Sequence, residues 1–487
     1  MANLAASAPP TATSMHIRAN AHATTVDPPP PPSPTMPEDE ADAVPADLAP
    51  ALSFESPLWL AIASGCESHR DLKTPVIDLT EIQGLDSGGR QREDAAATLE
   101  AVMAAVAPDT EVLHITGDTP TNEQWVALGE HFTNIRFLNV CTGWDECWVD
   151  DDFPLNWPLE LLVISDASSE RVSTPAVLEG RIKHLVLFYT CSLRFEGPKT
   201  DELMNGAEVL HFVPREKNDT DDAEAATKTE NEQPAEEGEG DESDGIKIYS
   251  VPHEWNKWIA AKYVGQELCF SPDPPEGGPP SAMEKLEIVG NDALRTFIYM
   301  ALARPHILFG LQSLNLDSPS SNDLFNVHTG ILLAMLPALL NLTTLRLTLG
   351  SAMYTTLLEA AAENNQPFLH TALPASLETL HFRGPVSMAP HVPAFVFAFK
   401  KENFLPDLKR ISFVLDLPDK DSESPSEASL EELRAAHEAC RKVLDAAAAR
   451  GVVVEGFVEP WFEYHPGLRR AIDNRWETLD EIASARS

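Results

Sequence analysis

The stretch LETLHFRG, residues 377–384, places Leu380 and Phe382 on either side of a single polar residue. Related phrases recur along the chain, as EVLHITGD at 111–118 and MEKLEIVGN at 283–291. Two apolar residues separated by one residue point to the same face of a β-strand, because side chains alternate along a strand. The phrase therefore predicts a short strand with one buried face, used repeatedly.

Aligning the chain on this phrase reveals a series of apolar pairs. From 113 to 210 the pairs follow one another at steps of 25, 24, 23 and 25 residues, and from 286 to 411 at steps of 28, 31, 35 and 31. This recurrence indicates a stacked repeat protein, because each unit can bury its apolar face only against its neighbours. The pairs are Ile77/Leu79, Leu113/Ile115, Leu138/Val140, Leu162/Ile164, Leu185/Leu187, Leu210/Phe212, Leu286/Ile288, Leu314/Leu316, Leu345/Leu347, Leu380/Phe382 and Ile411/Phe413.

The segments between the strands differ between the two halves of the chain. In the second half, 291–305, 321–340 and 351–365 each begin with a residue that can cap a helix and continue with apolar residues at helical spacing. The connectors of the first half carry Pro and Asp, and we expect loops or short helical turns there. Residues 429–451 predict the clearest helix, and the VVVEGF stretch at 452–457 predicts a last strand.

The phrase resembles the leucine-rich repeat, whose consensus runs L-x-x-L-x-L-x-x-N/C. The match is best from Leu286 to Asn291, whereas LTTLRL and LETLHF match only the leucine part. The resemblance covers about 70–460, and its irregular style is similar to the repeat region of fungal F-box-type proteins, without a recognisable F-box. It implies an α/β fold, a leucine-rich-repeat-like solenoid with a curved parallel sheet and with loops, then helices, on its convex side.

Composition divides the chain into five segments. The first is rich in Pro, Ala and Thr and low in aromatic residues, so it cannot offset the entropy of ordering. Another carries thirteen acidic residues against two lysines over 216–244. We expect a disordered tail at 1–50, irregular repeats at 51–215, a disordered acidic insertion at 216–245, helix-bearing repeats at 246–457, and at 458–487 a cap whose aromatic residues, beginning with Trp461, cover the open end of the stack.

The charge and cysteine content exclude several classes of function. The 487 residues carry a net charge of −41, so neither nucleic acid nor an anionic membrane is an expected partner. The six cysteines show no CxxC spacing, which argues against a zinc ribbon or a disulfide-rich secreted domain. No apolar run approaches the roughly 18 residues that span a bilayer. A cytoplasmic or nuclear protein is expected.

No motif for catalysis or metal binding stands out. The chain contains no GxGxxG, GxxxxGK[ST], GxSxG or HExxH pattern. Residues 141–157 combine five acids with three tryptophans, which favours an exposed loop whose tryptophans pack on a neighbouring repeat, with an acidic-aromatic contact patch as the alternative. His114, His211 and His381 share one position between core residues, but on separated strands. We expect no catalytic residue, no metal and no cofactor.

Residues that flank each core pair point to the other, concave face of the sheet. In the first half this face is apolar, and a strand spacing of ~4.8 Å would join its side chains into one patch. Such a patch marks an interaction site, unless a segment of the same chain covers it. The predicted apolar patch consists of Phe137, Leu161, Val186 and Phe188.

In the second half the concave face carries basic residues on three consecutive strands. Arg suits bidentate contacts with carboxylate or phosphate. The row is either ordinary surface charge or a site for an acidic ligand, which is a partner or the chain's own 216–244 segment acting as a cover. The predicted basic stripe consists of Arg346, His381, Arg383 and Arg410.

These features favour a non-catalytic protein–protein interaction scaffold that binds an unknown protein partner on the concave face of the solenoid. Two alternatives stay open. The F-box-like resemblance implies a substrate-recognition subunit of a ubiquitin ligase. Leucine-rich repeats combined with an acidic segment are similar to Ran GTPase-activating proteins, which implies a regulator of a GTPase.

Overall fold

The computed structural model describes the chain from residue 44 onward, with gaps. Residues 1–43, the acidic stretch 216–244 and most of 458–487 lie outside the described residues. The described ranges are 44–86, 89–92, 94–142, 153–165, 171–172, 174–188, 194–195, 210–214, 259–263, 266–270, 280–290, 293–318, 330–351, 368–417, 427–457 and 461.

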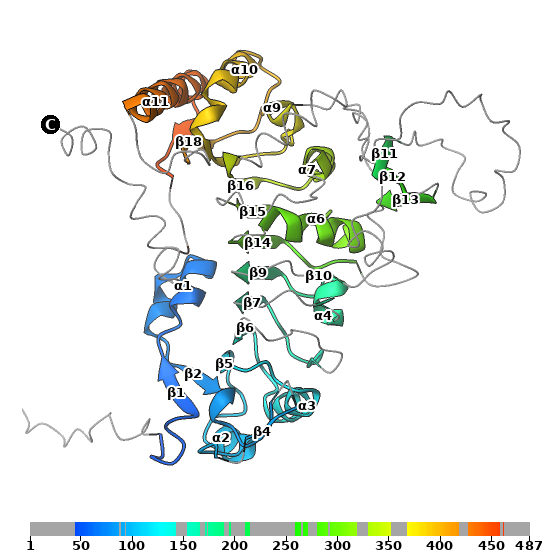
Figure 1. Ribbon diagram of the computed structural model, residues 1–487, viewed down its shortest axis with the longest axis vertical. Coiled ribbons are helices and arrows are strands. Elements are labelled where there is room, and N and C mark those ends of the chain that lie inside the picture. The colour runs from blue at the N-terminus through cyan, green and yellow to red at the C-terminus, as the bar shows by residue number, and fades with distance from the viewer. Residues whose placement is uncertain are drawn as a thin grey trace, which may run out of the picture. The chain divides into compact units, whose positions relative to one another are not determined.

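One large, mostly parallel sheet organises the described residues (Figure 1). It has twelve strands and is not closed into a barrel, since β1 and β19 form its two edges. Only the first pair of neighbours runs antiparallel. In spatial order the strands are β1 (Leu52–Glu55), β2 (Thr74–Asp78), β5 (Val112–Gly117), β6 (Phe137–Thr142), β7 (Leu161–Ser165), β9 (His184–Phe188), β14 (Lys285–Val289), β15 (Ser313–Ser318), β16 (Thr344–Leu349), β17 (Thr379–Pro385), β18 (Arg410–Leu417) and β19 (Val453–Val454).

The strand register confirms most of the predicted alignment. Leu113 pairs with Leu138, and Leu162 pairs with Leu185. The row continues without a slip across the later strands, from Leu286 through Leu314, Leu345 and Leu380 to Ile411. A slip of one residue would move a strand's apolar set to the other face, so the shared leucine row fixes the register.

Two of the predicted pairs do not join this row. Strand β11 (Leu210–Pro214) belongs to a separate antiparallel sheet with β12 (Ile259–Tyr263) and β13 (Gln266–Phe270), and β9 pairs directly with β14. The prediction for Leu210/Phe212 is therefore wrong, because antiparallel pairing satisfies that strand's backbone locally. Ile77 pairs with Ile115 of β5. Leu79 lies beyond the end of β2, at the start of the 3₁₀ turn η3 (Leu79–Glu81), so only Ile77 of this predicted pair belongs to the sheet.

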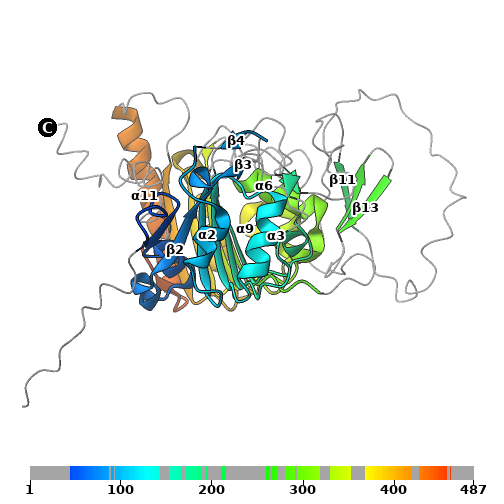
Figure 2. The same cartoon turned by 90° about the horizontal axis from the view of Figure 1, so that it is seen from below.

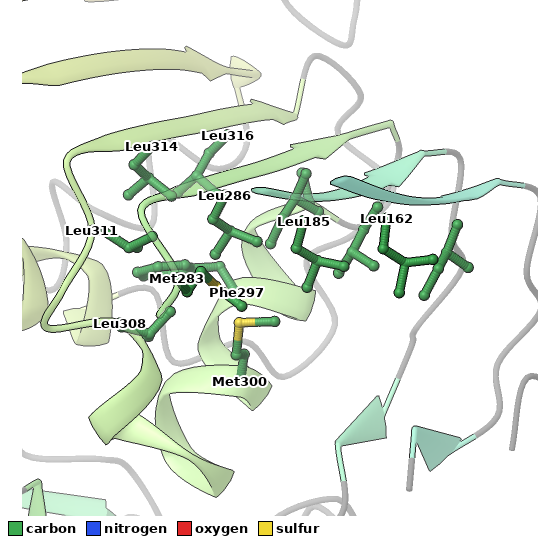
Figure 3. Close-up of a cluster of buried hydrophobic side chains, with 14 of the residues drawn as sticks. Leu162, Leu185, Met283, Leu286, Phe297, Met300, Leu308, Leu311, Leu314 and Leu316 are labelled. Carbon is green, nitrogen blue, oxygen red and sulfur yellow. The ribbon is translucent and has the colours of Figure 1, made fainter. Parts of the chain in front are cut away.

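The face of the sheet that carries the leucine row, here called the core face, packs against the helices. Seen from below, the strands lie one behind another, with α3 and α6 to one side (Figure 2). Leu185, Leu286 and Leu314 point from neighbouring strands toward Phe297 and Met300 of α6 (Figure 3). All five side chains have no exposed surface, so this is one continuous apolar core.

The helices fit the predicted halves in part. The predicted helix at 291–305 is α6, and that at 429–451 is α11, where Gly451 follows with a φ of 83°. In the first half α3 runs longer than the expected short turn, since Thr121 and Gln124 form a capping box at its start. The helices are α1 (Leu58–Ser64), α2 (Leu99–Ala104), α3 (Asn122–His131), α4 (Pro175–Leu178), α6 (Ala293–Ala303), α7 (Gly330–Met335), α9 (Leu369–Ala372), α10 (Val392–Phe399) and α11 (Glu427–Ala448).

Short elements complete the description. None of the helices within the described ranges has both the length and the apolar character that crossing a membrane requires. Leu48 packs into the core, so the folded part of the chain includes residues before the predicted boundary at residue 51. The short elements are η2 (Glu67–Asp71), η5 (Pro305–Ile307), η7 (Leu336–Ala338), η8 (Val386–His391), β3 (Gly84–Leu85), β4 (Gln91–Arg92), β8 (Arg171–Val172) and β10 (Arg194–Phe195).

Candidate binding face

The predicted apolar patch is covered by the chain itself. It lies on the face opposite the core face, here called the second face, and α1 lies on that side of the strands (Figure 1). Trp59 and Leu60 of α1 pack into the same buried cluster as the patch. The patch is thus an internal interface rather than the open docking surface that the sequence predicted. Its four members are Phe137, which is partly buried, and Leu161, Val186 and Phe188, which are at most 3% exposed.

Helix α1 owes its position to a few local residues. Pro57 precedes the helix, and Gly65 ends it in the left-handed conformation, with a φ of 66°. Between them Trp59, Leu60 and Ala61 are buried. Strands that are apolar on both faces need cover on both, and α1 supplies it on the second face.

Trp461 provides a second piece of this cover. Its side chain is 1% exposed, and its ring centroid lies 5.5 Å from that of Phe188 on β9. Its indole Nε1 donates a hydrogen bond of 3.0 Å to Glu287 Oε2 on β14. The predicted cap at 458–487 placed this residue at the open end of the stack, whereas it lies on the second face in the middle of the sheet. The rest of that segment's aromatic residues lie outside the described residues.

Glu287 is the centre of a buried polar network. Its carboxylate accepts hydrogen bonds from Asn315 Nδ2 at 3.0 Å and from Trp461, and it lies 2.9 Å from His184 Nε2. Burial alone would raise the pKa of Glu287, but the contacts with His184, Asn315 and Trp461 together lower it to about 2. The carboxylate is therefore charged at neutral pH and tied to three strands or segments at once.

Arg383 of the predicted basic stripe is not a surface charge. Its side chain is 4% exposed, and Nε donates a hydrogen bond of 2.6 Å to Asp416 Oδ1. Burial raises the pKa of Asp416, and the Arg383 guanidinium opposes that effect. Because the charge of Arg383 is taken up inside the chain, its assignment as a contact for an acidic partner is wrong.

Arg346 and His381 lie beneath the segment that follows β19. The Phe457 ring centroid is 5.5 Å from the Arg346 guanidinium carbon and 6.5 Å from the His381 ring centroid. His381 Nε2 is 4.0 Å from Glu455 Oε2. Burial and the charges of Arg346 and Arg410 lower the pKa of His381 to about 4, so the ring is neutral at pH 7.

Arg410 is the member of the predicted stripe that stays exposed. Its Nε donates a hydrogen bond of 3.3 Å to Thr379 Oγ1. The structure thus places the four residues on neighbouring strands as predicted, but in three different environments: Arg383 buried in an ion pair, Arg346 and His381 under an aromatic ring, and Arg410 at the surface.

Several buried polar atoms of the second face lack a hydrogen bond. Both carboxylate oxygens of Asp317 accept none of ordinary geometry, although this side chain is 1% exposed. Burial raises the pKa of Asp317, opposed by the nearby Thr348 hydroxyl and by the charges of Arg383 and Arg346. Buried polar atoms are normally paired, so each of these atoms carries an uncompensated desolvation cost. On β15–β18 the others are Asn315 Oδ1, Thr348 Oγ1, His381 Nδ1 and Ser412 Oγ, and on β2 and β5 Thr74 Oγ1 and His114 Nε2 also lack a partner.

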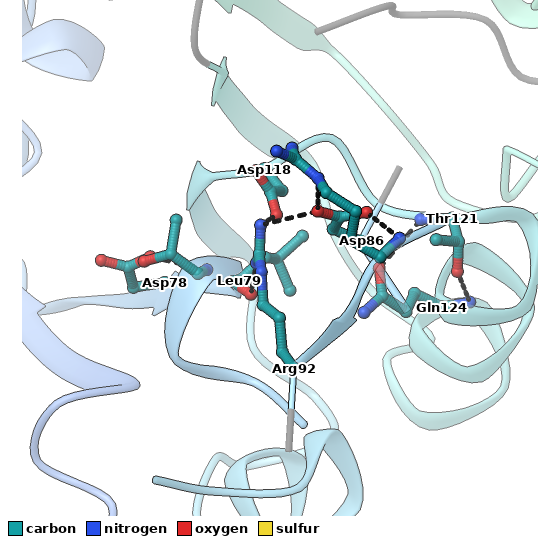
Figure 4. A network of polar contacts seen from close by, with 9 residues as sticks. Asp78, Leu79, Asp86, Arg92, Asp118, Thr121 and Gln124 are labelled. Carbon is teal, nitrogen blue, oxygen red and sulfur yellow. Dashed lines mark hydrogen bonds and ion pairs between the residues drawn. The ribbon is translucent and has the colours of Figure 1, made fainter. Parts of the chain in front are cut away.

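A second polar network lies at the carboxyl ends of the first strands (Figure 4). Arg92 pairs with Asp118 and donates a hydrogen bond of 2.8 Å to the Leu79 carbonyl. Arg90 Nε lies 2.7 Å from Asp86 Oδ2. These contacts fasten the β3–β4 hairpin to the end of the sheet, and each carboxylate here is neutralised by an arginine. The network is structural.

The acidic-aromatic stretch 141–157 is described only in part. Residues 143–152 lie outside the described residues. Phe153 and Trp157 pack against Trp125 of α3, and Trp157 Nε1 donates a hydrogen bond of 2.6 Å to the Phe132 carbonyl. Trp157 thus packs on the preceding helix of the chain, whereas Trp144 and Trp148 lie outside the described residues.

Metal ligation finds no support in the described part of the chain, where His, Cys, Asp and Glu side chains form no group of three or more suited to an ion.

Comparisons of the chain with protein-family models, with curated proteins and with solved structures each return no match.

The sequence predicted the second face but not the polar network around Glu287. Glu287 and Asn315 each stand between two core residues and therefore face the same side as the predicted stripe, but an isolated acid at such a position is typical of a solvated side chain. Their role depends on His184 and Trp461, which are 103 and 174 residues away from Glu287 in the chain. No local signal in the sequence joins residues so far apart.

Proposed function

We propose that the chain is a non-catalytic protein–protein interaction scaffold. In this proposal it is a leucine-rich-repeat-like solenoid that binds a protein partner on the second face of β14–β18. The observation that carries the proposal is the row of buried polar atoms without hydrogen bonds on β15, β16 and β18, represented by Asp317, Thr348 and Ser412.

The chemistry of this face suits recognition by complementarity. A partner that supplies hydrogen-bond donors to Asp317 and pairs with the hydroxyls of Thr348 and Ser412 would remove an existing cost, because buried polar groups are normally paired. Arg410 at the exposed margin adds a charge that favours an acidic partner and raises its association rate. The face of β5–β9, by contrast, is already filled by α1.

Affinity capture with the full chain as bait tests the proposal. A Thr348→Val, Ser412→Ala bait removes two hydroxyls at nearly constant shape, and we expect about tenfold less of the partner to be captured. Thr343→Val is the control, because that half-buried threonine precedes β16 and its hydroxyl already donates to the Gln312 carbonyl at 3.1 Å. Equal capture by the double variant and the wild-type chain would refute the proposal. Recovery of a cullin adaptor in the same capture would favour the ubiquitin-ligase alternative.

A further inference from the structure

The segment after β19 crosses the second face of the sheet. Glu455 lies beside His381 of β17, and Phe457 lies over Arg346 of β16. Four residues later Trp461 contacts β14 and β9. Glu455, Phe457 and Trp461 therefore contact, in this order, strands β17, β16, β14 and β9 of the second face. We call Glu455, Phe457 and Trp461 the crossing residues.

Each crossing residue meets a matching group on the sheet. Phe457, 4% exposed, presents its ring to the Arg346 guanidinium, a cation–π contact. Trp461 fills an apolar recess beside Phe188 while its N–H reaches a half-buried carboxylate, which is the typical use of an amphipathic aromatic residue. An extended segment that inserts aromatic anchors into pockets on another element is a general form of peptide recognition.

We propose that the crossing residues are an internal ligand that occupies the partner site of the second face. The partner binds by displacing them with an extended segment of the same chemistry: an acidic residue, an aromatic residue two positions later, and a tryptophan four positions after that. The inference rests on the proposed function and adds the class of ligand. The tryptophan is the anchor, because its own side chain is 1% exposed and its N–H donates to the half-buried Glu287 carboxylate.

The internal ligand leaves some polar atoms of the site without hydrogen bonds, so a partner segment that pairs with them can displace it. It satisfies Glu287 but leaves Asp317, Thr348 and Ser412 without hydrogen bonds. Upstream it is held by β19, which pairs with β18 through only two residues, Val453 and Val454, both exposed. A partner segment that also supplies the missing donors therefore binds better, although it must compete with a tethered segment at an effective concentration on the order of millimolar.

The test uses a labelled peptide with the sequence EGFVEPWFEYH, residues 455–465, and the full chain. In a Phe457→Ala, Trp461→Ala chain the internal ligand loses its anchors, and fluorescence anisotropy should show binding at least tenfold tighter than to the wild-type chain. The matched control is the same peptide with alanine at the position of Trp461, which should not bind measurably. Absence of binding to the released chain, or equal binding of both peptides, would overturn the inference.

A milder variant keeps the inference testable if the double variant does not fold. Trp461→Phe retains a ring beside Phe188 but loses the indole N–H, and the loss of a hydrogen bond to a charged group should release the site by about tenfold. The Trp461→Phe chain should therefore bind the peptide about tenfold more tightly than the wild-type chain. Indistinguishable affinities would contradict the role of tryptophan as anchor.

Two further outcomes separate this inference from its basis. In the first, the peptide binds the Phe457→Ala, Trp461→Ala chain, but the Thr348→Val, Ser412→Ala bait captures as much partner as the wild-type chain. The internal ligand is then supported and the proposed function is refuted. If capture depends on those hydroxyls but no chain binds the peptide, the proposed function stands and the internal ligand fails. Sedimentation tests a second copy as occupant: a concentration-dependent wild-type dimer that Trp461→Ala abolishes would overturn binding of a different partner.

Discussion

Strands β5–β9 and strands β15–β18 present the same row of apolar residues to the core face, yet their second faces carry opposite chemistry. On β7 and β9 the second face holds Leu161, Val186 and Phe188, all buried beneath α1 and Trp461. On β15 and β16 it holds Asp317 and Thr348, which are buried with polar atoms lacking hydrogen bonds.

The second face of this sheet differs between the two regions in how completely the chain itself covers and pairs it. Apolar cover is non-directional and is complete once α1 and Trp461 are in place, so the first region is a second hydrophobic core. Polar groups require specific partners at specific positions, and the chain's own residues provide only part of them. In the proposed function, the first region stabilises the sheet and the second region binds the partner.

The largest effect is expected in the apolar region. Phe188→Ala removes a fully buried ring between β9 and Trp461 and should lower the free energy of unfolding by about 4 kcal/mol, the usual cost of an aromatic cavity. Chemical denaturation measures it. The exposed Phe397, which is 61% accessible, is the control, and Phe397→Ala should cost far less. Equal losses would mean that α1 and Trp461 do not cover Phe188 in solution.

Breaking the buried ion pair of the polar region should have the next largest effect. Arg383→Met removes the partner of the half-buried Asp416 carboxylate and leaves it uncompensated, at a cost of about 3 kcal/mol. Arg410→Met, at an exposed position, should stay within about 0.5 kcal/mol of the wild-type chain. If both variants behave alike in denaturant unfolding, Arg383 is a surface charge after all.

Protonation should weaken both regions in the same pH window. Burial lowers the pKa of His114 on β5 to about 4, and burial with two arginine charges does the same for His381 on β17, against an ordinary value of 6.5. The unfolded chain therefore binds more protons between these values, and stability is lost as the pH falls from 6.5 to 4. Replacing either histidine by asparagine should flatten the unfolding free energy across this window, whereas His437→Asn, at an exposed position of α11, should not.

The smallest effect is expected from the hydroxyl at the centre of the polar region. Thr348→Val replaces an unpaired buried hydroxyl by a methyl group of similar shape, so stability should change by less than about 0.5 kcal/mol or increase slightly. Thermal unfolding measures it. A loss well above this value would show that the hydroxyl is paired, for instance with Asp317, and would remove one support of the recognition surface.

Much of the fold could be predicted from the spacing of apolar residues. Pairs of apolar residues separated by one residue predicted which side chains of each strand face the core, from Leu113 to Ile411, because side chains alternate along any strand. The Leu210/Phe212 pair had the same spacing and nevertheless joined another sheet. Local pattern defines which residues are buried on a strand, but it does not choose between two possible strand neighbours.

The candidate site was predictable only in outline. Register placed Arg346, His381, Arg383 and Arg410 on one face of neighbouring strands, and the structure agrees. The ion pair with Asp416 is a diagonal contact, because Asp416 stands two residues beyond Val414, the register partner of Arg383, and register alone does not show which of the facing side chains meet. A charge that looks exposed in a strand pattern becomes internal when a neighbouring strand contributes the opposite charge.

The sequence by itself determined the apolar pair that recurs on each strand of the main row. It also determined which face of the sheet that pair occupies, because side chains alternate along a strand and spacing therefore fixes the face. The tertiary structure alone decided what covers the other face. Helix α1 and Trp461, more than 400 residues apart at the ends of the described chain, meet over β9 and β14. Arg383 of the LETLHFRG stretch became a buried partner of Asp416 in the same way. Contacts of this kind arise from packing between distant segments, for which sequence spacing carries no rule.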